Sequence, residues 1–251
     1  IRRPPRSTLS SSSAASDVYK RQVYYDTNLA PSASFVSTKV QRDLTSYAES
    51  SQLNKYGARF KYSKLLKVID QSHESVTSNI TTIEMRRDLR LATSEVAEYA
   101  VDFGNQFHIK SMSGFNIRSS AFRVINISSD VYLFDTPDVN GKKGQIGLFS
   151  LSQGSSTPII QRRNIGVINY ETGRITLDPI NIVSGKTKDS VQIMEISASP
   201  ESNDIIGLQD LYLQLDNSVV DMVVDQISSG IDPSGSTYTV TTSYKNGSIV
   251  R

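Results

Sequence analysis

The sequence predicts an α+β protein: a small helix-helix-strand unit followed by an antiparallel, β-rich, sandwich-like region. Two observations support this class. Between residues 32 and 71 the apolar positions recur at the helical spacing of three or four residues. From about residue 95 onward, short segments of alternating hydrophobicity follow one another at roughly ten-residue intervals, which is typical of many short strands joined by turns.

The first predicted helix begins at Ser32 or Ser34, either of which can cap it, directly after Pro31. One face of this helix carries the apolar positions and is expected to be buried. That face consists of Val36, Val40, Leu44, Tyr47 and Ser51. The segment from Asn54 to Gly57 is the predicted stop, with Gly57 as the left-handed residue after the helix.

The second predicted helix is capped by Ser63 and ends near Gln71. From Asn79 the period changes from helical to two. Thr81, Ile83 and Met85 share one face of a half-buried strand, and the residues between them, including Glu84, face the other way. The predicted units are therefore residues 1–22, 23–94, 95–200 and 201–251, of which the last two are β-rich.

Residues 1–22 are predicted to be a non-native, disordered tail. They show no apolar periodicity, and they carry five cationic side chains against Asp17 alone. The string SSSSAASDVYKRQ resembles a translated sequencing adapter. Because the formal charge of the whole chain is only +2, the remainder is negative, and the basic balance gives no reason to expect nucleic-acid binding.

The dipeptide Asn246-Gly247 predicts a two-residue hairpin turn after a strand over residues 237–244. The return strand would have only residues 248–251. Either this hairpin is a stub or the chain is cut short at this end.

The composition excludes several kinds of site. There is no cysteine, so no disulfide, thiolate zinc site or thiol nucleophile is possible. Apolar runs of four or five residues are far shorter than the roughly 20 needed for a membrane-spanning helix. The histidines, His73 and His108, are too far apart in sequence to give a metal-ligand spacing.

Three clusters of polar residues were weighed as sites. Asp70, His73 and Glu74 are the nearest approach to a catalytic constellation, but a polar loop between helix and strand explains them better. Asp135, Asp138 and Asn140 have calcium-binding residue types at an unsuitable spacing, and a hairpin loop accounts for them.

The third cluster is the arginine group Arg86, Arg87 and Arg90, which could bind phosphate. Neighbouring carboxylates indicate a mixed-charge strand end instead. The sequence therefore predicts no catalytic residue, no metal site and no cofactor, and hence a protein that is not an enzyme.

Several strings of the sequence, in their order, carry a family resemblance. They are residues 56–60 (YGARF), 62–65 (YSKL), 76–81 (VTSNIT), 103–105 (FGN), 165–175 (IGVINYETGRI) and 199–205 (SPESNDI). Together they resemble the baseplate-J-like family, in the version found in the large wedge subunit of contractile-tailed phage baseplates. The broader family usually has Gly-Val where this chain has Ser75-Val76.

The resemblance implies a structural role in the virion, in the tail baseplate, after assembly in the bacterial host cytoplasm. The implied partners are other baseplate wedge subunits and further copies of the same chain, with no nucleic acid and no membrane. An alternative from another class is a receptor- or carbohydrate-binding β module of a tail appendage. Such a module would present a cluster of aromatic and acidic residues on the loops at one end, whereas the loops here are rich in Gly, Ser and Lys.

Overall fold

The computed structural model of the 251-residue chain describes residues 14–152, 157–207, 213–216, 220–230, 244–245 and 248–249. Within these residues the chain is mostly β, with two helices and many strands, arranged in mainly antiparallel sheets. The predicted α+β class is therefore wrong, although the antiparallel β-rich region expected after residue 95 is present. The helix-helix-strand segment is not a unit of its own, because its strand pairs with strands from the β-rich region.

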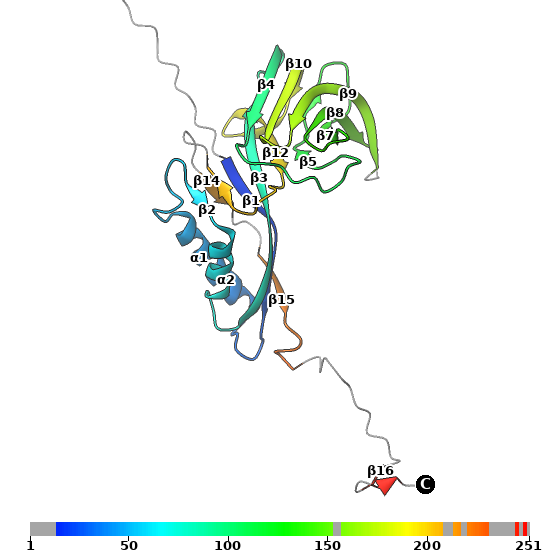
Figure 1. Ribbon diagram of the computed structural model, residues 1–251. Coiled ribbons are helices and arrows are strands. Elements are labelled where there is room, and N and C mark those ends of the chain that lie inside the picture. Colours follow the sequence, from blue (N-terminus) through cyan, green and yellow to red (C-terminus); the bar gives the residue numbers. More distant parts are fainter. Residues whose placement is uncertain are drawn as a thin grey trace, which may run out of the picture.

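A seven-stranded sheet has the order β11-β12-β3-β1-β14, with β15 also on β1 and β5 also on β12. Its strands are β1 (Ala14–Tyr25), β3 (Val76–Arg90), β5 (Ile117–Ser119), β11 (Lys186–Lys188), β12 (Val191–Ala198), β14 (Leu213–Asp216) and β15 (Asp221–Val224). The 15-residue strand β3 organises this sheet, since its first part pairs with β1 and its last six residues pair with β12. Figure 1 shows β3 running from the helices into the β-rich part of the molecule.

Strand β1 begins inside the stretch that the sequence analysis set aside as a tail. Ala14–Tyr25 pairs antiparallel with β3 and parallel with β14 and β15. Arg21 is only 1% exposed, so its side chain lies in the interior. Residues 14–22 are thus part of the folded sheet, which corrects the expectation of a disordered tail there, while the adapter resemblance remains unconfirmed.

The two helices are α1 (Ala33–Ala48) and α2 (Tyr62–Asp70), and they pack together beside β1 and β3 (Figure 1). Ser32 caps α1 by accepting a hydrogen bond from the Phe35 N–H, as predicted. Helix α1 ends at Ala48, earlier than predicted, and Gly57 adopts its left-handed conformation only after a further loop. The side chains that the helices bury are Val36, Val40 and Leu44 from α1 and Leu65 and Ile69 from α2.

A six-stranded antiparallel sheet has the order β4-β10-β9-β8-β7, with β6 also on β10. Its strands are β4 (Val96–Asp102), β6 (Arg123–Val124), β7 (Tyr132–Pro137), β8 (Lys143–Leu151), β9 (Pro158–Asn169) and β10 (Arg174–Ser184). The buried apolar side chains of both sheets and both helices form one contiguous core.

Two short strand pairs complete the described structure. β13 (Ile205–Ile206) pairs with β2 (Arg59–Phe60), and β16 (Tyr244–Lys245) pairs with β17 (Ser248–Ile249). Tyr244 is opposite Ile249, which is the pairing expected around the predicted Asn246-Gly247 turn. Those two turn residues, and most of the predicted incoming strand, lie outside the described residues.

The predicted class failed because strand content was underestimated at both ends of the first unit. Residues 14–22 of β1 were assigned to the tail, with a short strand expected only from residue 23, and β3 was expected to begin only at Asn79. On the second face of β3, Glu84 is only 4% exposed despite its expected solvent position, although Thr82 on the same face is exposed. Because β3 pairs with both β1 and β12, it lies inside the seven-stranded sheet and is not the edge of a small separate unit.

Candidate functional site

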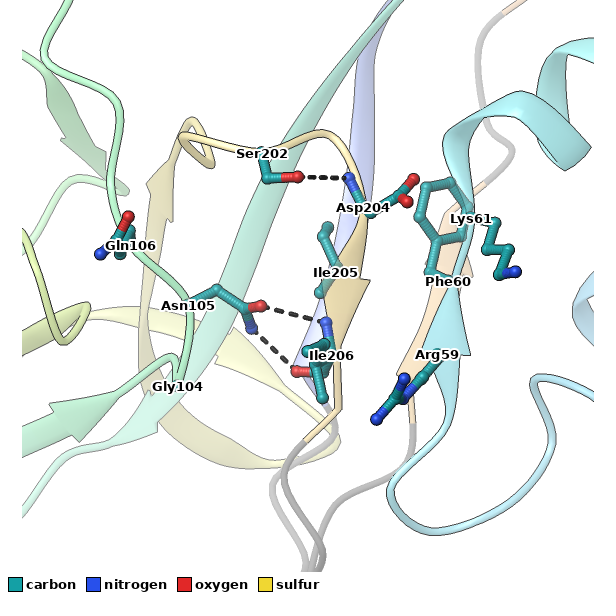
Figure 2. A pocket seen from close by; sticks show the side chains of 10 residues that line it. All are labelled: Arg59, Phe60, Lys61, Gly104, Asn105, Gln106, Ser202, Asp204, Ile205 and Ile206. Carbon is teal, nitrogen blue, oxygen red and sulfur yellow. Dashed lines mark hydrogen bonds between the residues drawn. The ribbon is translucent and has the colours of Figure 1, made fainter.

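A groove of about 400 Å³ with a mixed polar and apolar lining lies where the helices meet the β-rich part. Figure 2 shows its ten lining residues, which come from three separate stretches of the chain: residues 59–61, 104–106 and 202–206. These stretches overlap three of the strings that carry the family resemblance, residues 56–60, 103–105 and 199–205. The groove is therefore a junction that brings distant parts of the sequence together.

The Asn105 side chain holds one wall of this junction. Its amide nitrogen donates to the Ile206 carbonyl over 2.9 Å, and its amide oxygen accepts from the Ile206 N–H over 3.0 Å (Figure 2). The amide thus pairs with Ile206 as a neighbouring strand would. On the other side, β13 pairs with β2, where Ile205 is opposite Phe60. The segment is fixed from both sides.

Asp204 connects the segment 202–206 to the helical side of the groove, because it caps helix α2. The position before the helix is Lys61, whose side chain makes no capping hydrogen bond. Instead, the Tyr62 N–H donates to Oδ1 of Asp204 over 2.8 Å, from 142 residues further along the chain. The carboxylate also complements the positive end of the helix dipole. The predicted cap Ser63 lies inside the helix.

Two tyrosines on this side of the molecule have raised pKa values. Burial is the main cause of the raised pKa of Tyr47, and the nearby negative charge of Asp204 acts in the same direction. Burial also raises the pKa of Tyr62, whose hydroxyl donates to the Thr81 carbonyl over 2.6 Å. Both hydroxyls therefore stay protonated at neutral pH, and they act as packing and hydrogen-bonding groups.

The structure separates the members of the Asp70, His73 and Glu74 cluster. His73 Nδ1 lies 2.8 Å from the Ser75 hydroxyl and accepts from the Ser75 N–H, so its partner is within the same turn. Asp70 accepts from the Asn79 side chain over 2.6 Å. Within the described residues neither carboxylate bonds to His73. Ser75 is fully buried, so its hydroxyl cannot meet a substrate.

His108 joins the same junction that the groove occupies. Its Nδ1 lies 2.8 Å from Oε2 of Glu201, with both side chains about half exposed. The backbone of residues 106–108 bonds to that of residues 199–201, through the His108 N–H to Ser199 and the Glu201 N–H to Gln106. His108 is thus part of the connection between two segments.

Asp135, from the weighed calcium cluster, is completely buried and accepts four hydrogen bonds. The donors are the Asn116 N–H (2.6 Å), the Asn116 amide (2.7 Å), the Ile117 N–H (3.0 Å) and the Tyr170 hydroxyl (2.5 Å). Asp138 and Asn140 lie apart from it, exposed in the β7–β8 hairpin. Burial, followed by the Asp135 carboxylate, raises the pKa of Tyr170 well above its usual range.

The arginine cluster lies along β3, where charges of both signs are interleaved. Arg86 Nε is 3.8 Å from Asp88, and Lys188 from β11 lies 2.6 Å from the other oxygen of Asp88. Across the described residues there is no group of three or more acidic or histidine side chains placed to hold a metal ion. The residues that the sequence reasoning missed are Asp204 and Asn105, whose partners are more than 100 residues away.

The comparison with known families gives one match. Residues 18–88 match the family model for baseplate structural protein gp6, C-terminal domain III. No curated protein matches the chain. Among the described residues, neither helix has the length and apolar character required to cross a membrane.

The matched stretch contains most of β1, both helices, β2 and nearly all of β3. It therefore covers the helical side of the seven-stranded sheet and, of the residues that line the groove, residues 59–61. The family is a structural one, located in the phage tail. Residues 18–88 are similar to a domain of a phage baseplate structural protein, and this match supports a structural role in a phage baseplate.

Proposed function

We propose that this chain is a structural component of a contractile-tail baseplate wedge, which works by binding other wedge subunits and further copies of itself. The observation that carries the proposal is the match of residues 18–88 to a baseplate structural domain. In this proposal the chain is assembled in the bacterial host cytoplasm and ends in the virion. It is not an enzyme.

The surface of the described residues is compatible with extensive contacts. Large apolar side chains are exposed on many elements, including Val96 at 68%, Val139 at 95% and Ile206 at 53%. Single exposed apolar residues are normal, but groups of them mark interaction surfaces. A stable wedge contact should bury at least about 1,000 Å².

Binding to other subunits is tested by mixing the full chain with the purified structural proteins encoded by neighbouring reading frames. Size-exclusion chromatography with light scattering should show a complex of defined stoichiometry. A β-rich tail-fibre domain of similar size serves as the control and should not join the complex. Failure of every neighbouring baseplate protein to bind would contradict the proposal.

Self-association is measured separately, by mass photometry of the chain alone and of the complex. More than one copy of the chain per complex is expected. A single copy in every complex would contradict self-association and leave the binding to other subunits standing. Cleavage of a polysaccharide by the purified chain would contradict the non-enzymatic role.

A further inference from the structure

Part of strand β9 forms an open sheet edge. β9 pairs with β8 along nearly its whole length, but it pairs with β10 only at residues 166–169. Over residues 158–164 no described strand lies on the other side, and all seven residues are exposed. Figure 1 shows β9 at the rim of its sheet, curving away from β10.

A β-bulge explains why the two halves of β9 have different neighbours. The register with β8 shifts between the pairs of Ile146 and Leu148, and Asn164 at this point has a φ of 57°. An extra residue in one strand bends it and increases its twist. The bend separates the first half of β9 from β10, so that among the described strands none pairs with its backbone N–H and C=O groups on that side.

Beside this edge lies a row of apolar side chains on one sheet face. Phe149 of β8 is opposite both Tyr132 of β7 and Ile160 of β9, so the three share a face. Phe115 packs edge-on against Phe149, with ring centroids 5.3 Å apart, and is 42% exposed. Ile160 at the edge is 40% exposed. A strand added to β9 would continue this apolar face.

The charge on the edge is entirely positive. Arg162 and Arg163 are both exposed, and neither is in an ion pair within the described residues. Residues 157–164, TPIIQRRN, contain no carboxylate. A second copy pairing through the same edge would bring four guanidinium groups into one short strand pair, and like charges close together are destabilising there. A partner segment with acidic side chains is favoured.

We propose that residues 158–164 of β9 bind an extended, acidic segment of another protein by strand addition. Main-chain hydrogen bonds to the open edge would provide affinity, as in other complexes where a peptide adds a strand to a sheet. Carboxylates facing Arg162 and Arg163, together with apolar side chains beside Ile160, would provide specificity. Under the proposed function this partner is a different baseplate subunit, but the test below does not depend on that identity.

The test uses the full chain and two synthetic ten-residue peptides of equal β propensity. One alternates valine and threonine with glutamate, and the other has lysine at every glutamate position. At low salt the acidic peptide should bind about tenfold more tightly or better, by isothermal titration calorimetry. Hydrogen exchange followed by mass spectrometry should show slower exchange of the amides of residues 158–164 when this peptide is bound.

Two double variants locate the site. Arg162→Gln with Arg163→Gln should abolish the preference for the acidic peptide, whereas Lys39→Gln with Arg42→Gln on α1 removes the same charge and should preserve it. Equal binding of both peptides, no binding, or protection elsewhere in the chain would overturn the proposal. Dimerisation of the unmodified chain with slower exchange of the amides of residues 158–164 would also overturn it. Because no other baseplate protein is involved, these results are independent of the subunit-binding test.

Discussion

The buried Asp135 carboxylate gives the sharpest test of how the two sheets are held together. Asp135 belongs to β7 of the six-stranded sheet, and Tyr170 directly follows β9 of the same sheet. The other donors, Asn116 and Ile117, lie at the start of β5, which pairs with β12 in the seven-stranded sheet. One carboxylate therefore bonds to both sheets, so substituting it should disturb their contact.

Asp135→Ala would leave four buried donors without their acceptor. Each unsatisfied buried donor costs about 1–3 kcal/mol, although relaxation and an entering water reduce the sum. Removing one member of a buried charged network typically costs about 3–5 kcal/mol, and we expect a loss in this range. For a chain of this size, such a loss lowers Tm by about 10 °C.

This loss in the free energy of unfolding is measured by urea unfolding. The signal is far-UV circular dichroism, because the chain has no tryptophan to report unfolding by fluorescence. Asp138→Ala is the matched control, because it removes the same charge from an exposed hairpin position and should change the free energy of unfolding by less than about 1 kcal/mol. If Asp135→Ala were no less stable than Asp138→Ala, the network would not hold the sheets together, and the reasoning would be wrong.

Three further predictions concern single contacts. The pKa of Tyr170 in the folded chain is raised above the unfolded value of 10.0. The protonated Tyr170 hydroxyl therefore stabilises the fold fully below pH 10, and this contribution is lost as the pH rises further. Tyr170→Phe should accordingly reduce the fall in the urea midpoint at alkaline pH. Asp204→Ala should cost about 1 kcal/mol through loss of the Tyr62 cap, while Asp204→Asn retains a capping oxygen and should cost less, in the same assay. Asn105→Ala should speed hydrogen exchange at Ile206 at least tenfold, and an unchanged rate would show that the side-chain pairing adds nothing.

The sequence predicted well those features that depend on neighbouring residues. The spacing of Val36, Val40 and Leu44 placed the buried face of α1, and all three are fully buried. The cap was predicted at Ser32 or Ser34, and the structure gives Ser32, because a cap acts within three residues of its own position. Thr81, Ile83 and Met85 of β3 are buried as the period of two predicted.

Features that depend on distant residues were not predictable from one sequence. Ser63 was the expected cap of α2 because no local pattern shows that Asp204 would reach the helix from 142 residues away. Glu84 was assigned to a solvent face because alternation reveals one buried face and cannot show that Lys110 lies 3.5 Å from Glu84 on the other. The role of Asn105 was hidden for the same reason.

The boundaries of the family match can now be compared with the contacts of the matched segment. The match ends at residue 88, but β12 pairs with β3 on both sides of that position. β13 pairs with β2, and Asp204 caps α2, so later residues also hold the helical side in place. The short stretch 199–207 makes these contacts and bonds to residues 105–108 on the β-rich side. Residues 199–207 therefore connect the matched helical side to the β-rich side in addition to β3, so the matched segment depends on contacts made more than 100 residues later in the chain.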